Sequence, residues 1–145
     1  MLEVKVQKVD GAILPEYKTI GSSGMDLYAY LPDGTVNIAP NESKLIKTGI
    51  FIELPDGYEA QVRPRSGLAL KYGITVLNTP GTIDTDYRGE IGVILINHSN
   101  NIFAINHGDR IAQIVFSKFE KVEFKVVDSL NSTERNDGGF GHTGI

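Results

Sequence analysis

An arginine, a serine and a glycine stand together where a helix is expected to begin, in the segment RPRSGLALKYG at 63–73. Ser66 is followed by GLALKY and then by Gly73, which predicts about two helical turns that Ser66 caps and Gly73 ends. A guanidinium from Arg65, a hydroxyl and free backbone N–H groups at a helix start favour an anion such as phosphate. The alternative is structural: Ser66 only caps the helix, and Arg65 pairs with a carboxylate.

A polar turn between two apolar stretches is expected in NTPGTIDTDYRGEIGV, at 78–93. We expect a hairpin whose incoming strand ends at Ile83 and whose outgoing strand begins at Glu90. The edge of such a strand can offer N–H and C=O groups to a planar ligand. Asp84 follows a threonine and an isoleucine, so we expect it to be partly desolvated, where a carboxylate is a better base. The alternative for Asp84 and Asp86 is a solvated turn in which they cap the backbone.

A glycine-rich end, RNDGGFGHTG at 135–144, combines an arginine, an aromatic ring and four glycines. Backbone N–H groups of such a segment can surround an anion, and Phe140 can stack on a nucleobase. The alternative is a polar end without a ligand, because residues 131–145 are rich in polar residues and glycine and have no apolar period. Taken alone, this segment is expected to be mobile.

Short strands are expected to position these segments, because apolar and polar residues alternate along most of the chain. Such stretches begin at Glu3, Thr35, Tyr58, Glu90 and Val122. Turn sequences separate them about every ten residues, among them LPDG at 31–34 and again at 54–57. This pattern predicts an all-β sandwich, jelly roll or small barrel with one short helix.

Composition restricts the class of protein further. A length of 145 residues suits one domain, and the hydrophobic fraction of 41% with a charged fraction of 22% argues against both disorder and a membrane protein. No apolar run approaches the ~20 residues that cross a bilayer, and the first residues do not resemble a secretory signal, so we expect a cytoplasmic protein without a membrane partner. The absence of cysteine excludes disulfides and thiolate metal sites. A net charge of -4 gives no general attraction to nucleic acid, so phosphate binding requires a local site.

Five segments resemble, in order and spacing, the five motifs of the homotrimeric dUTPase family. They are GSSGMDLYA from Gly21, RPRSGLALKYG from Arg63, NTPGTIDTDYRGEIGV from Asn78, GDRIAQIVF from Gly108 and RNDGGFGHTG from Arg135. The resemblance implies an all-β fold: a jelly-roll-like β-barrel with one short helix and a flexible C-terminal arm. It also implies a homotrimer in which all three subunits build each active site. A jelly-roll domain would span 1–130, and residues 131–145 would form a mobile arm that closes over a neighbouring subunit's site.

The resemblance also implies a reaction, the hydrolysis of dUTP to dUMP and pyrophosphate by a water that attacks the α-phosphate. This reaction would keep uracil out of DNA and supply dUMP for thymidylate synthesis. Asp84 would be the catalytic residue that orients and deprotonates the water. Tyr87 would lie against the deoxyribose and exclude a 2′-hydroxyl by a clash rather than by a missing hydrogen bond.

Substrate-binding roles follow from the same resemblance in three groups. The uracil edge would be read by Asn78 and by the backbone around Gly81, Thr82, Ile83 and Gly92. The phosphates would be held by Arg65, Ser66, Gly67 and Gln113. The arm would add Arg135 at the γ-phosphate and Phe140 over the uracil, together with Gly141 and Thr143.

A magnesium ion is the cofactor that the resemblance implies. Asp26 would hold a water of this ion, which the three phosphates would bind directly, so we expect no preformed metal cage. The histidines lack the spacing of zinc ligands and are expected to be surface or structural residues. They are His98, His107 and His142.

The last motif departs from the family pattern at two positions. It commonly begins Arg-Gly and has Ser-Thr after Phe-Gly, whereas this chain has Asn136 and His142. The histidine replaces one hydroxyl that would contact the γ-phosphate, although an imidazole can also donate a hydrogen bond to phosphate.

Two other functions are compatible with this fold family. A dCTP deaminase would need a glutamate over the cytosine ring, whereas the expected turn reads Asp-Thr-Asp-Tyr-Arg-Gly, the hydrolase pattern. A non-catalytic regulatory trimer on the same scaffold would be favoured by the loss of Asp84, Arg135 or Phe140, and all three are present.

Overall fold

The structure is a computed structural model that describes residues 2–139. This part of the chain contains eleven strands and one helix, which confirms the predicted all-β class with a single short helix. In chain order they are β1 (Lys5–Lys8), β2 (Gly24–Tyr28), β3 (Val36–Ile38), β4 (Ser43–Lys47), β5 (Ile50–Glu53), β6 (Tyr58–Arg63), α1 (Ser66–Tyr72), β7 (Ile74–Val76), β8 (Gly81–Ile83), β9 (Gly92–Asn97), β10 (Phe103–Ile105) and β11 (Arg110–Lys118). Within these residues, no helix has the length and apolar character needed to span a bilayer.

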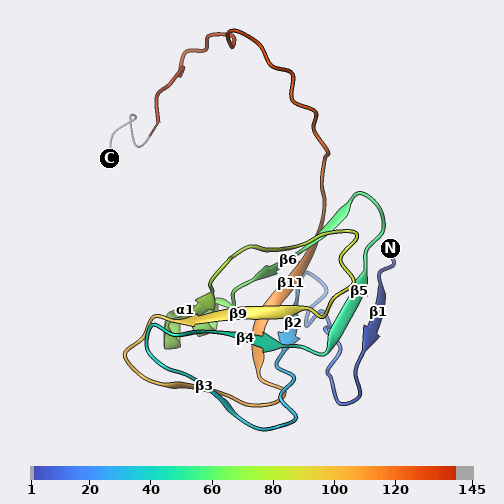
Figure 1. The fold of residues 1–145 in the computed structure, drawn as a ribbon, viewed down its shortest axis with the longest axis vertical. Helices are drawn as coiled ribbons and strands as arrows, with labels where there is room; N and C mark the ends of the chain where they lie inside the picture. Colours follow the sequence, from blue (N-terminus) through green and yellow to red (C-terminus); the bar gives the residue numbers. More distant parts are fainter. Residues whose placement is uncertain (1, 140–145) are drawn as a thin grey trace.

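The described strands form four antiparallel sheets, of which two make up most of the body. The larger has the order β2-β11-β6-β8 and the smaller the order β4-β9-β7. Figure 1 shows β4 and β9 crossing in front of β2 and β11. The faces turned toward each other are apolar: Leu27 and Ile114 from the larger sheet join Val93 and Leu95 from the smaller in one buried cluster. Alternation of apolar and polar residues along each strand builds this core.

Helix α1 ends as predicted but does not begin as predicted. Gly73 adopts a left-handed conformation with φ +65°, and its N–H donates to the carbonyls of Ala69 and Leu68. The capping position is occupied by Arg65, which is extended and makes no side-chain cap hydrogen bond. The prediction that Ser66 caps the helix is therefore wrong, because Ser66 is itself the first helical residue.

The hairpin predicted at residues 78–93 is also wrong. Its two strands are present, but β8 pairs with β6 in the larger sheet, whereas β9 pairs with β4 and β7 in the smaller one. The N–H of Leu77 donates to the carbonyl of Ile94 at 2.8 Å and extends the β7–β9 pair. The segment from residue 78 to 91 therefore leaves the β7–β9 pair, and within this segment β8 pairs with β6 of the larger sheet.

The strand predicted from Val122 does not form. The last strand, β11, ends at Lys118, and residues 119–139 contain no strand. After the N–H of Phe119 donates to the carbonyl of Gly57, the chain runs away from the sheets (Figure 1). Phe124 and Val126 are more than nine-tenths exposed there, because no described strand lies beside them. The predicted arm from residue 131 is the outer part of this run.

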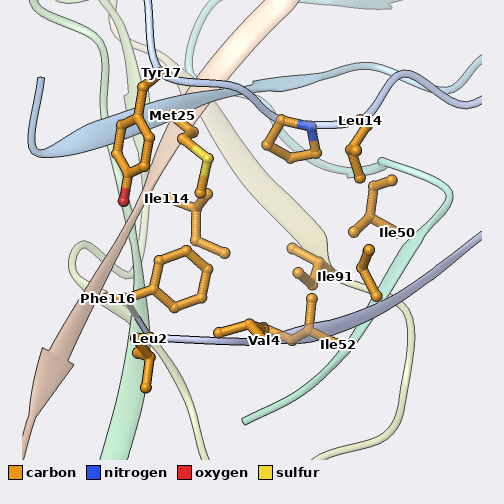
Figure 2. A pocket seen from close by; sticks show the side chains of 12 residues that line it. Leu2, Val4, Leu14, Tyr17, Met25, Ile50, Ile52, Ile91, Ile114 and Phe116 are labelled. Carbon is orange, nitrogen blue, oxygen red and sulfur yellow. The ribbon is translucent and has the colours of Figure 1, made fainter. Parts of the chain in front are cut away.

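An apolar cavity of about 350 Å³ lies beside β1. Figure 2 shows Val4 and Ile52 at one side of it and Met25, Ile114 and Phe116 at another. None of the predicted site residues within 2–139 lines this cavity. Its lining lacks the convergent polar groups of a nucleotide site, so the cavity is a break in the apolar packing and not a candidate for the chemistry.

A buried asparagine joins the loops at one end of the sheets. The side-chain amide of Asn97 donates to the carbonyls of Ile38 at 2.9 Å and of Asn101 at 2.7 Å. Its carbonyl oxygen accepts hydrogen bonds from the N–H and hydroxyl of Ser99. All its side-chain polar atoms make hydrogen bonds, and these compensate for the water contacts that the buried amide loses.

Candidate active site

An ion-pair cluster forms at one end of the larger sheet, around Asp26 on β2. The Arg65 Nε atom lies 3.0 Å from Asp26 Oδ1, and the Arg110 Nη1 atom lies 3.5 Å from Asp26 Oδ2. The side chain of Asp26 is only 14% exposed. Of the structural alternative, the pairing of Arg65 with a carboxylate is therefore confirmed, whereas the capping by Ser66 is not. Two guanidinium groups beside one carboxylate leave a net positive charge that suits phosphate.

Gln113 on β11 joins this cluster because it is the register partner of Asp26. Its Nε2 atom donates to the carbonyl of Pro64 at 3.0 Å. A Cβ atom on Gly24 would lie 2.5 Å from Gln113 Oε1, so the amide occupies space that only glycine leaves free. The sheet register and this close contact together hold the Gln113 amide beside Arg65.

Arg110 is a site residue that our interpretation of the sequence missed, although it lies within the motif GDRIAQIVF. The β11–β2 register shifts between Arg110 and Ala112, which marks a β-bulge. Bulges change the direction of a side chain, and this one places the guanidinium of Arg110 beside Asp26. The carbonyl of Arg110 also accepts a hydrogen bond from Arg65 Nη1 at 3.0 Å.

The second group of predicted residues lies on the turn that follows β8. The N–H of Tyr87 donates to the carbonyl of Asp84 at 3.2 Å, which closes the turn. Arg88 Nη1 donates to the carbonyls of Thr85 at 2.7 Å and Tyr87 at 2.9 Å. The Tyr87 hydroxyl donates to the carbonyl of Glu90 at 3.0 Å. These bonds give a short exposed turn one defined conformation.

Asp84 itself is exposed in the single chain, so the prediction that it is partly desolvated is wrong for this state. It borders an open groove with Asp86, Glu53 and Lys121 among its lining residues. Lys5 donates a hydrogen bond to Glu53 at 2.8 Å, and this bond lowers the pKa of the Glu53 carboxyl. Alternation along β8 buries Gly81 and Ile83, but the chain turns away from the sheet at the next residue.

The residues predicted to read a base surround an unpaired strand edge. Strand β8 is the last strand of the larger sheet, so in the described chain the outer N–H and C=O groups of Gly81, Thr82 and Ile83 bond to no further strand. The Asn78 amide lies against Gly81, where a Cβ would be 3.3 Å from Nδ2. At Gly92, a Cβ would be 2.6 Å from the Leu45 side chain. This edge can pair with a planar ligand as it would with another strand.

A single chain keeps the two groups of residues apart. Asp84 is one step beyond Ile83, which pairs with Ala60 and is thus level with Phe116. Gln113 lies three residues before Phe116 on β11, and Asp84 lies one residue after Ile83 in the opposite sense. Four residue steps of about 3.3 Å therefore separate Gln113 from Asp84 along the strand direction. A separation of roughly 13 Å along the sheet is too long for one water to contact both side chains.

The remaining predicted residues are on the C-terminal segment. Arg135 Nε donates to the carbonyl of Gly138 at 2.7 Å, a contact within the segment itself. Ser66 and Gly67 begin α1 beside Arg65 and are exposed. Predicted contacts from Phe140, Gly141, His142 and Thr143 lie outside the described residues.

Residues 2–139 contain no group of three His, Asp or Glu side chains that could hold an ion. Asp26 is the carboxylate that pairs with Arg65 at the candidate phosphate site, and its Oδ2 contact with Arg110 is long, at 3.5 Å. One such carboxylate fits a magnesium ion whose other ligands are waters and phosphate oxygens.

Comparison with known proteins decides the family. The dUTPase family model matches residues 10–144. The chain belongs to the dUTPase family. It is 53% identical over 143 residues to the deoxyuridine 5′-triphosphate nucleotidohydrolase of Finegoldia magna, with 99% of each chain covered.

Two solved dUTPase structures share the fold. A mutant of the Staphylococcus bacteriophage 80alpha dUTPase with dUpNHpp is 26% identical and has a TM-score of 0.86, with 99% of each chain covered. A mutant dUTPase from phage phi11 of S. aureus, described with a coordinated structural Mg(II) ion, is 25% identical. Its TM-score is 0.77, with 90% of this chain and 99% of that chain covered.

Proposed function

We propose that this chain hydrolyses dUTP to dUMP and pyrophosphate. The observation that carries the proposal is the arrangement of Arg65, Gln113 and Asp26 at one end of the larger sheet, in a chain of the dUTPase family. The related phage enzyme was solved with dUpNHpp, in which an NH group replaces the oxygen that bridges the α- and β-phosphorus atoms. Replacement at that position blocks the bond whose cleavage releases pyrophosphate.

The proposed chemistry is an in-line displacement at the α-phosphorus. A water oxygen bonds to phosphorus, the bond to the bridging oxygen breaks, and pyrophosphate leaves with the electron pair. Asp84 orients the water and accepts its proton. Arg65 and Gln113, with Ser66 and Gly67 at the start of α1, hold the phosphate oxygens as charge shifts toward the leaving group.

Base and sugar are recognised on and beside β8. The unpaired edge from Gly81 to Ile83 offers N–H and C=O groups to the uracil ring, and the Asn78 amide and Gly92 complete this surface. Tyr87 lies over the deoxyribose and leaves no room for a 2′-hydroxyl. This arrangement separates dUTP from UTP by a clash.

A complete site takes residues from more than one copy of the chain. Asp84 and Gln113 are roughly 13 Å apart along the sheet in one subunit, so a water at Asp84 needs the phosphate site of a neighbour. Arg135 and Phe140 belong to the C-terminal segment, and its described part runs away from the body (Figure 1). The proposed homotrimer places this arm over a neighbour's nucleotide.

Uncovered apolar surface also favours assembly. Val122, Phe124 and Val126 alternate along the outgoing segment and are 73%, 91% and 95% exposed. Exposure of a contiguous apolar stripe is costly for a soluble monomer and is typical of a surface that a partner covers. An exchange of this segment between copies would cover it.

Magnesium is the proposed cofactor. Asp26 would hold it through a coordinated water, while substrate phosphates would supply the direct ligands. When bound, the ion neutralises phosphate charge and favours one triphosphate conformation. The pairing of Asp26 with Arg65 keeps the carboxylate in place beside the phosphate site.

In the cell, the proposed role is in the cytoplasm. A chain without cysteine suits a reducing compartment. Removal of dUTP would keep uracil out of DNA, and the product dUMP would be a precursor for thymidylate. No nucleic acid or membrane takes part in this proposal.

Pyrophosphate release from the purified protein tests the proposal. We expect release with dUTP and magnesium, and at least 100-fold less with dCTP, dTTP or UTP. Removal of the metal with EDTA should slow the reaction, and addition of magnesium should restore it. Ammonia release from dCTP would identify a deaminase instead, and binding of dUTP without turnover would identify a regulatory protein.

A further inference from the structure

Glycine at position 89 lies against the hydroxyl end of the Tyr87 side chain. A Cβ atom on Gly89 would be 2.3 Å from the Tyr87 hydroxyl oxygen, 2.5 Å from Cζ and 2.8 Å from Cε2. Gly89 is not among the glycines with positive φ, so the backbone at this position does not require glycine. The contact with the ring requires it.

Hydrogen bonds hold the tyrosine in this position from both ends. The Tyr87 hydroxyl donates to the carbonyl of Glu90, and the Tyr87 N–H donates to the carbonyl of Asp84. Arg88 bonds to the carbonyl of Tyr87 itself. Tyr87 is nevertheless 45% exposed, so part of its surface is open to a ligand.

We infer that Gly89 is a specificity-determining residue, because the space left by its missing side chain sets how far the Tyr87 ring extends toward the sugar. This inference rests on the proposed role of Tyr87. Rejection of a 2′-hydroxyl by a clash depends steeply on the position of the ring. A methyl group at position 89 would move the ring by about 1 Å before ordinary contact distances return, and shifts of that size change rates by up to about 100-fold.

The first test is Gly89→Ala, assayed with dUTP, UTP and dCTP. The displaced ring would crowd the deoxyribose itself, so we expect kcat/KM for dUTP to fall toward that for UTP, which the ring already excludes, and the ratio of the two to fall at least tenfold. The corresponding ratio for dUTP against dCTP should stay within twofold, because the edge of β8 reads the base. A merely structural role for Gly89 would lower all three kcat/KM values by the same factor and leave both ratios unchanged, and that result would overturn the inference, as would an equal change in both ratios.

A double-mutant cycle with Tyr87→Ala adds an independent test. Without the ring, Gly89→Ala should have no further effect on the dUTP-to-UTP ratio, whereas additive effects would contradict the inference. Tyr87→Phe should keep the ring beside Gly89 but lose the hydrogen bond to Glu90. We therefore expect its dUTP-to-UTP ratio to lie between those of the wild type and Tyr87→Ala.

Failures of the two proposals are distinguishable. If Tyr87→Ala still rejects UTP, the proposed role of Tyr87 is wrong, whatever Gly89→Ala does. If only Gly89→Ala is without effect, the inference about Gly89 is wrong. Should Gly89→Ala be too unstable to purify, the double variant, which has no clash, must be as stable as Tyr87→Ala alone. A double variant that is also unfolded refutes the inference.

Discussion

The side chain of Gln113 fills the space that a Cβ atom on Gly24 would need. The built Cβ would be 2.5 Å from Gln113 Oε1, and the same amide donates to the carbonyl of Pro64 at 3.0 Å. The Gln113 amide on β11 thus contacts both β2 and the segment just before α1. Backbone and side chain together leave the Gln113 amide little freedom to move, which is the form of support that a phosphate site requires.

Substitution Gly24→Ala should therefore displace Gln113 without unfolding the protein. The φ angle of Gly24 is not positive, so alanine fits the backbone. We expect kcat/KM for dUTP to fall about 100-fold, as for other misplacements near 1 Å. Pyrophosphate release measures the effect. Gly21→Ala is the matched control, since a Cβ there meets nothing within 4 Å. Equal kcat/KM values for Gly24→Ala and Gly21→Ala would show that the position of the Gln113 amide does not matter for the reaction.

Asp84→Asn should remove turnover while binding persists. The amide keeps the shape of the side chain but accepts no proton from water, so we expect kcat to fall by about 100- to 10,000-fold. Affinity for dUpNHpp should stay within several-fold of the wild-type value. Calorimetry and single-turnover kinetics measure the two quantities. A variant with near-normal kcat would exclude Asp84 as the base.

Mixed trimers should recover activity from two inactive variants. Asp84 and Arg65 act in different subunits under the proposed function, so Asp84→Asn and Arg65→Ala damage each site from different sides. On co-expression, random assembly gives about a quarter of the sites both intact residues. Each variant purified alone should be nearly inactive. The absence of any recovery, with mixed trimers demonstrated by mass, would place both residues in one chain's site.

Removal of residues from Arg135 onward should separate folding from chemistry. The described part of this segment supplies no buried side chain, so the unfolding midpoint should hardly change. Turnover should fall at least ~100-fold, a loss of about 2.7 kcal/mol in transition-state stabilisation. Rejection of UTP should survive, because it is assigned to Tyr87. A truncated protein with the full rate would exclude Arg135 and Phe140 as a lid.

Asn97→Ala should destabilise the fold by about 2–4 kcal/mol. The amide is fully buried and donates to the carbonyls of Ile38 and Asn101, and alanine removes both of these hydrogen bonds. Urea unfolding at fixed protein concentration measures the change, because unfolding of an oligomer depends on concentration. Asn100→Ala, in the same loop and exposed, should change stability by less than about 0.5 kcal/mol.

The sequence alone was enough to predict the all-β class, the single helix and its end at Gly73. These features are local. Apolar and polar residues alternate along the sequence of a strand. The left-handed conformation that ends the helix favours glycine regardless of distant contacts. The resemblance also predicted that Arg65 and Gln113 bind the phosphates and that Asp26 holds a water of the magnesium ion, and these three residues lie close together in the structure.

Tertiary structure decided which strands pair and which side chains meet. The hairpin at 78–93 failed because strand pairing is chosen by partners distant in sequence, and β8 and β9 found theirs in different sheets. The stretch from Val122 has the period of a strand, but a ladder needs a neighbour, and the described chain offers none. A β-bulge after Arg110 directs its side chain toward Asp26, and no pattern in the sequence predicts this bulge. Periodicity is local chemistry, whereas pairing, burial and direction depend on the whole fold.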